Sequence, residues 1–149
     1  MSASHIVRDA LENFWERHGL SAHWEKNAVY EIATDFGFLV RLAAEEETGL
    51  IRVCAALCPE APEERREAVH AVLLEANLAD RLVFGGSLAL DPETLEIVYQ
   101  RAYDSRQGGA GGFFRFFIAF TEAASGLQAA VAALISDEDD ALIPSGLRL

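Results

Sequence analysis

The segment from Leu50 to Cys58 places the strongest constraint on how this chain can fold. Successive side chains of a strand point to opposite faces, and here both faces are apolar except at Arg52. One face carries Ile51, Val53, Ala55 and Leu57, and the other carries Leu50, Cys54, Ala56 and Cys58. A sheet that covers a core on one side normally has a polar outer face. We therefore expect the second face of this strand to meet another surface.

Two more strands precede this segment. Residues 28–34 and 38–44 are short and rich in residues that favour strands, and they are separated by the turn at residues 35–37. The acidic turn at residues 45–49 joins the second of these strands to the third. Turns this short predict an antiparallel meander.

Helical spacing marks three other segments. Residues 4–18 carry apolar residues at helical intervals, Gly19 lies where a helix usually stops, and a long apolar helix begins at Phe113. A further helix follows Pro59 to Pro62 and has two apolar stripes. The first stripe contains Val69, Val72, Leu73 and Ala76, and the second contains Ala68, Ala71, Leu74 and Leu78. One sheet occupies only one stripe, so the second predicts contact with another helix.

Residues 84–91 and 95–103 predict a second hairpin, which a glycine-rich loop at residues 105–112 connects to the last helix. The expected order is αβββαββα, an α+β fold with a twisted antiparallel sheet and three helices. We expect one domain over residues 1–135 and an acidic C-terminal tail over residues 136–149.

Charge limits the possible partners. Among 149 residues, 24 acidic residues outnumber 12 basic ones, which gives a formal net charge of −12. Such a chain is not expected to bind nucleic acid or an anionic membrane surface. Residues 113–135 are long enough to span a bilayer, but Arg115 and Glu122 favour a buried helix over membrane insertion. We expect a cytoplasmic protein.

No catalytic, cofactor-binding or metal site is expected. Cys54 and Cys58 are too far apart along a strand to form a disulfide, and their spacing is not that of a redox pair or a zinc site. The four histidines lack HExxH spacing, and the glycine-rich loop lacks both GxGxxG and a P-loop lysine. A Cys54–His70 nucleophile pair has no supporting motif.

Several strings resemble the Tir chaperone family of class I type III secretion chaperones. They are "VYEIATDFGFLVRL", "GLIRVCAALC", "VLLEANL" and "GGSLALDPETLEIVYQR", and the resemblance covers about residues 5–135. It implies a protein that binds the N-terminal region of a secreted effector and keeps it soluble and competent for export.

The resemblance also implies a homodimer formed by the second helix and the adjacent strand. The expected interface residues are Ala71, Leu74, Leu78 and Leu88. An extended effector segment is expected in a groove between the first helix and the outer face of the first sheet. The expected partner-binding residues are Trp15, Trp24, Leu39, Cys54 and Ala56.

Two other functions stay open. One is a regulatory protein of the same fold that sequesters a transcription factor or another chaperone. The other is a small ligand-binding or isomerase-like α+β domain, which requires a closed pocket with a buried carboxylate, and Glu31 is the candidate for that carboxylate.

Overall fold

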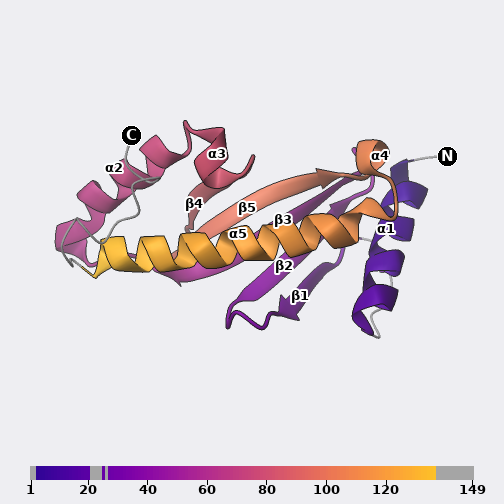
Figure 1. Ribbon diagram of the computed structural model, residues 1–149, viewed down its shortest axis with the longest axis horizontal. Coiled ribbons are helices and arrows are strands. Elements are labelled where there is room, and N and C mark those ends of the chain that lie inside the picture. The colour runs from indigo at the N-terminus through magenta and orange to yellow at the C-terminus, as the bar shows by residue number, and fades with distance from the viewer. Residues whose placement is uncertain (1–2, 21–24, 26, 137–149) are drawn as a thin grey trace. The chain divides into compact units, whose positions relative to one another are not determined.

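The computed structural model describes residues 3–20, 25 and 27–136 (Figure 1). Trp24 and the tail beyond Ser136 therefore lie outside the described residues. The elements in chain order are α1 (Ala3–His18), β1 (Val29–Ala33), β2 (Leu39–Glu45), β3 (Leu50–Pro59), the 3-10 helix η1 (Glu63–Arg65), α2 (Arg66–Ala76), α3 (Asp80–Val83), β4 (Ser87–Asp91), β5 (Glu96–Asp104), α4 (Ser105–Gly108) and α5 (Gly112–Ile135).

The five strands form one antiparallel sheet in the order β1-β2-β3-β5-β4. In β1 and β2, Val29 pairs with Ala43 and Ala33 with Leu39. In β4 and β5, Leu88 pairs with Tyr99 and Leu90 with Ile97, so all four of these residues share one face. The predicted α+β class, with a meander followed by a hairpin, is confirmed. Because β5 pairs with β3, β4 becomes an edge strand.

The structure adds short helices to the three that were predicted. Residues 105–112 were expected to be a loop, but Ser105–Gly108 form α4. The Asp104 side chain caps this turn by accepting a hydrogen bond of 3.0 Å from the backbone N–H of Arg106. The second hairpin also begins later than expected, at Ser87, because Phe84 and Gly85 have φ of 51° and 78°. Left-handed backbone cannot continue a strand.

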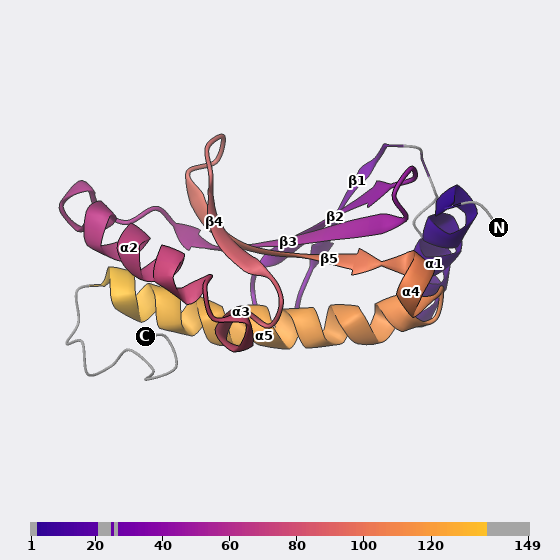
Figure 2. The ribbon, with the colours of Figure 1, turned by 90° about the horizontal axis from the view of Figure 1, so that it is seen from above.

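The described residues divide into two compact units, taken from Met1–Cys54 with Arg101–Thr121 and from Ala55–Gln100 with Glu122–Leu149. In the first unit, Phe14 of α1 contacts Phe113 and Phe117, with ring centroids 5.1 and 4.7 Å apart. In Figures 1 and 2, α4 lies against α1 within this unit. The single domain expected over residues 1–135 stays a prediction.

The second unit is organised around Tyr99, which is fully buried and donates a 2.7 Å hydrogen bond to the carbonyl oxygen of Val83. Gly86 passes so close to this strand that a Cβ atom there would lie 2.4 Å from the carbonyl oxygen of Gln100. No other residue fits at this position without displacing backbone. The C-terminal half of α5 lies beside α2 within this unit (Figure 2).

Among the described residues, α5 is the one helix long and apolar enough to cross a membrane. This is weak evidence for a span, since the core helix of a globular domain meets the same criterion. Its apolar residues recur every three to four positions, and that stripe is buried. The buried stripe includes Phe113, Phe117, Phe120, Ala124, Leu127, Val131 and Leu134.

Candidate functional site

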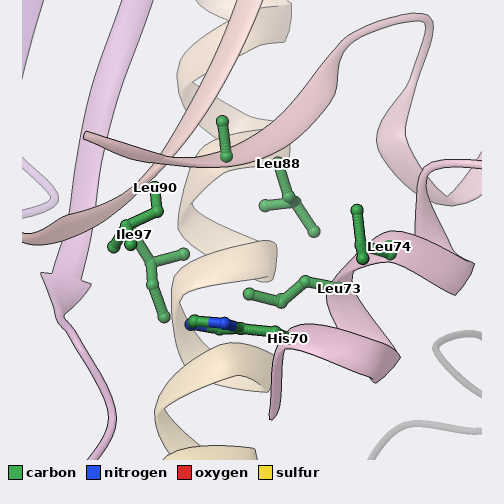
Figure 3. Close-up of a pocket in the computed structure, with 7 residues that line it drawn as sticks. His70, Leu73, Leu74, Leu88, Leu90 and Ile97 are labelled. Carbon is green, nitrogen blue, oxygen red and sulfur yellow. The ribbon is translucent and has the colours of Figure 1, made fainter. Parts of the chain in front are cut away.

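An apolar pocket of about 190 Å³ lies between α2 and the β4–β5 hairpin (Figure 3). We call it the α2–β4 pocket. It is partly open to solvent, and its lining is almost entirely hydrocarbon. The lining residues are His70, Leu73, Leu74, Leu88, Ala89, Leu90 and Ile97.

The periodicities of a helix and a strand together produce this lining. Leu73 belongs to the inward stripe of α2 and is buried, whereas Leu74 is one position further round the helix and is 68% exposed. On the opposite wall, Leu88, Leu90 and Ile97 share one face of the hairpin. Sequence reasoning did not assign a pocket here. The inward stripe of α2 and the alternation along β4 could have indicated it if the two had been assumed to face each other.

Asn77 fastens the two walls of the pocket together. Its side-chain oxygen accepts a 2.7 Å hydrogen bond from the backbone N–H of Leu88, and its side-chain nitrogen donates to the carbonyl oxygen of Leu88 at 2.9 Å. Both backbone groups of one buried residue are thus paired by a single amide. This gives a structural reason for the asparagine next to the end of the string "VLLEANL".

A histidine–carboxylate pair lies beside the pocket. His70 Nε2 is 2.9 and 3.0 Å from the two carboxylate oxygens of Glu60, whose side chain is largely buried. Burial acts to raise the pKa of Glu60. The hydrogen bonds from His70 and from the Ala61 N–H, with the charges of His70 and Arg66, outweigh burial and lower that pKa. The pair holds the segment before α2 against the helix.

The second apolar stripe of α2 is exposed. Leu74 and Leu78 are 68% and 83% exposed, and Ala71 is also exposed, so none of the described residues covers the stripe. The fourth expected interface residue, Leu88, is different because it is 4% exposed and lines the pocket. Leu88 can therefore pack beneath an interface, but its side chain offers little surface for a partner to contact.

The expected partner-binding residues of the first unit lie on different faces. The Trp15 ring packs against Tyr30, with centroids 4.7 Å apart, and Trp15 is 3% exposed. Tyr30 pairs with Leu42, whereas Leu39 pairs with Ala33, so alternation places Tyr30 and Leu39 on opposite faces of the hairpin. The structure therefore corrects the expected groove, because Trp15 is a core residue on the covered face and does not meet Leu39. Trp24 lies outside the described residues.

The other expected contacts remain accessible to different degrees. Leu39 is 49% exposed, and Cys54 and Ala56 are half-buried on the face of β3 that also carries Arg52. Arg52 forms an ion pair with Glu45 of β2, which shares its face with Leu39. The second face of β3 is thus neither core nor fully open.

The two cysteines lie in β3 and are not joined by a disulfide. Burial raises the pKa of Cys58 to about 11, and the nearby negative charges of Glu60 and Glu96 contribute. A thiol with so high a pKa is a poor nucleophile and a poor metal ligand at neutral pH. The described residues contain no cluster of three or more His, Cys, Asp or Glu side chains suited to a metal ion.

The carboxylate that an isomerase-like site requires is not buried. Glu31 is exposed, and Arg41 Nε donates to its carboxylate at 3.3 Å on the surface of β1 and β2. The α2–β4 pocket contains His70 as its only titratable lining residue. The lining is suited to holding apolar groups, and its one titratable residue, His70, is paired with Glu60.

No protein-family model matches the sequence, and no curated protein matches it. Solved structures do share its fold. The chain is similar to one in the ExsC–ExsE complex, with TM-score 0.71 and 15% identity over 93% of this chain and 100% of that one. A chain of the heterodimeric ExoU–SpcU complex, from the type III secretion system of Pseudomonas aeruginosa, matches with TM-score 0.64 and 14% identity over 85% and 98%.

A third match is the complex of the Yersinia pestis type III secretion chaperone SycH with a fragment of YscM2, with TM-score 0.58 and 16% identity over 81% and 98%. A protein of another kind also matches, YbjN of E. coli, described as a candidate transcription regulator, with TM-score 0.56 and 17% identity over 84% and 89%. At these identities the comparisons establish the fold. This chain has the α+β fold that occurs in type III secretion chaperones.

Proposed function

We propose that this protein is a cytoplasmic type III secretion chaperone that binds an extended segment of a secreted effector and keeps it soluble. The observation that carries the proposal is open apolar surface on a fold shared with chains of chaperone–effector complexes. In the described residues these surfaces are the exposed stripe of α2, the α2–β4 pocket and the side of β1 and β2 that carries Val29 and Leu39. Stoichiometric binding of an unfolded segment needs such surfaces and needs no catalytic group.

The surfaces divide between two partners in this proposal. The stripe of Ala71, Leu74 and Leu78 suits a second copy, because two such stripes can pack helix against helix. The face with Leu39, Cys54 and Ala56 suits the effector, whose main chain can add to the edge strand β1 while its side chains cover the apolar residues. The formal charge of −12 keeps a protein with such surfaces in solution and favours neutral or basic effector segments.

A substitution of Leu39 by Glu tests the effector face. Leu39 is half exposed, so Leu39→Glu should change the free energy of unfolding by no more than about 0.5 kcal/mol. It should weaken capture of the effector at least about tenfold, because the bound segment would bury an unpaired carboxylate. Ala56→Glu is a less selective test, since Ala56 is half-buried before any partner binds.

The matched control is Ile118→Glu on α5, which introduces the same charge at a similarly exposed apolar residue away from this face. Affinities are measured by calorimetry with the effector identified by co-purification and mass spectrometry. Equal affinities for the wild type, Leu39→Glu and Ile118→Glu would place the effector elsewhere on the protein.

The likeness to YbjN supports a second candidate, a regulatory protein of the same fold. The two candidates differ in the partner they predict. A regulator would co-purify with a transcription factor or another chaperone, whereas an escort would co-purify with a protein that is exported.

A further inference from the structure

The outer edge of β1 is open for pairing with another strand. β1 ends the order of strands in the sheet, so no described strand lies on its far side (Figure 1). The Thr34 N–H donates a 3.2 Å hydrogen bond to the carbonyl oxygen of Phe38, in the direction of β2. Because backbone directions alternate along an antiparallel strand, the N–H and carbonyl groups of Val29, Glu31 and Ala33 point away from β2, toward the open edge. A strand added at this edge would pair with these three residues.

The edge carries a negative charge at its centre. Glu31 is the one charged residue of β1, and its side chain lies on the side of β1 and β2 that carries Val29 and Leu39. Arg41 of β2 is directly opposite, with its Nε 3.3 Å from the carboxylate, and both side chains are about half exposed. Neighbouring strands are about 4.8 Å apart, so a residue added opposite Glu31 lies about 5 Å from Glu31 and about 10 Å from Arg41. Since the Debye length at 0.1 M salt is about 10 Å, the nearer charge dominates and the edge favours a cation.

Apolar side chains flank Glu31 on both sides. Val29 is 60% exposed, and Leu39, which pairs with Ala33, is 49% exposed. On an added strand, the residues two positions before and after the one opposite Glu31 would lie beside Val29 and Ala33 on the same face. Because Ala33 is small, a large apolar side chain above it would also cover Leu39. The edge is therefore complementary to a segment in which every second residue is apolar, basic and apolar in turn.

A second copy of β1 does not have this pattern. In the twofold-symmetric pairing that overlaps residues 29–33 of two chains, the two Glu31 carboxylates face each other. Like charges directly opposite each other destabilise an antiparallel pair. Glu31 therefore disfavours pairing between two copies of the chain, and a charge in an edge strand is one way in which natural sheets avoid such contacts.

We propose that the effector segment bound at β1 is an added strand with a lysine or arginine opposite Glu31 and with apolar residues two positions to either side. This inference rests on the proposed function and specifies which effector sequences the edge of β1 selects. Glu31 is the specificity-determining residue, since it sets the sign of the charge that the central position accepts. The formal net charge of −12 acts in the same direction at longer range by attracting basic segments.

Exchanging the charges of Glu31 and Arg41 tests this selection. The probes are labelled peptides of about nine residues in which threonine and valine alternate, with lysine, glutamine or glutamate in place of the central valine. The full-length wild type should bind the lysine peptide about three- to tenfold more tightly than the glutamate peptide, because one favourable or unfavourable cross-strand pair changes affinity up to about fivefold. The double variant Glu31→Arg with Arg41→Glu keeps the ion pair and the net charge, and its preference should be reversed.

The matched control is the double variant Arg8→Glu with Glu12→Arg, which reverses an exposed ion pair of 3.0 Å on α1. It should bind the three peptides as the wild type does. Equal affinities of the wild type for the three peptides, an unchanged preference after the Glu31–Arg41 exchange, or no measurable binding of any peptide would overturn the proposal.

The identified effector separates this proposal from the proposed function. Its bound segment should show the alternation, and it should bind the Glu31–Arg41 exchange variant at least about threefold more weakly than the wild type. Equal affinities would contradict the selection by Glu31 and leave the chaperone function standing. If the wild type captures no exported protein from the native source, the proposed function fails, while the peptide preferences still decide what the edge of β1 selects.

Discussion

Replacing Asn77 by Ala is the sharpest test of how the second unit is held together. The substitution removes both hydrogen bonds to Leu88, whose backbone N–H and carbonyl groups then lose their partners beneath a side chain that is 4% exposed. An unsatisfied buried backbone group costs about 1–3 kcal/mol. Two such groups give about 2–6 kcal/mol, and we expect the lower half of this range because Asn77 itself is half-buried and water can enter.

The assay is urea unfolding followed by fluorescence, with Gln100→Ala as the matched control. Gln100 donates one exposed 3.2 Å hydrogen bond to Ser87 on the same hairpin, so its loss should cost less than about 0.5 kcal/mol. The variant Asn77→Asp tests the direction in which stability changes with pH. Its carboxylate would face the Leu88 carbonyl oxygen, which raises the pKa of the introduced acid, so the variant should regain stability relative to the wild type as the pH falls. If Asn77→Ala lowers the free energy of unfolding no more than Gln100→Ala does, the two hydrogen bonds between Asn77 and Leu88 do not stabilise this unit.

Three further predictions concern the surface of the second unit and its titrating groups. Leu74→Asp should abolish dimerisation in light scattering without unfolding the chain, because Leu74 is 68% exposed, while Ile118→Asp should leave the dimer intact; a wild-type monomer at micromolar concentration would contradict the interface. Cys58 should react with iodoacetamide up to about 100-fold more slowly than an ordinary thiol at pH 8, since burial raises its pKa from 9.0 to about 11; a rate equal to that of a free cysteine would show that the thiol is exposed. Because the pKa of Glu60 is lower in the folded protein than its value of 4.5 in the unfolded chain, this carboxylate stabilises the fold above pH 4.5, and its contribution is lost as the pH falls through the folded pKa. The wild type should therefore lose more stability than Glu60→Gln between about pH 6 and about pH 3, and parallel losses would refute the pairing with His70.

Sequence reasoning was most successful where periodicity alone decides the structure. The alternation along β3 and the two stripes of α2 depend on local geometry, and the structure buries Ile51, Val53 and Leu73 while exposing Leu74 and Leu78 as that geometry requires. Short elements were missed because a single turn leaves no periodic pattern. The helix α4 depends on the Asp104 cap, which a glycine-rich sequence obscures.

The candidate site was harder to predict because it depends on which faces meet. Trp15 lies beside the apolar stripe of α1, and only the packing against Tyr30 shows that it belongs to the core. The α2–β4 pocket joins residues such as Leu73 and Leu90 from a helix and an edge strand, and no spacing in the sequence links them. The role of Asn77 was also visible only in the structure. This residue belongs to a string that carried the family resemblance, and its two hydrogen bonds to Leu88 explain why an asparagine is needed there.

The proposed function requires that this protein hold a segment of a secreted protein in extended form. The most direct measurement is hydrogen exchange on the complex purified from the native source, after mass spectrometry has identified the partner. We expect the backbone amides of one contiguous partner segment to exchange more slowly in the complex than in the free partner. The partner residues that flank this segment should exchange at the rate of an unfolded chain. A partner bound through a folded domain, with the same protection free and bound, would contradict the account.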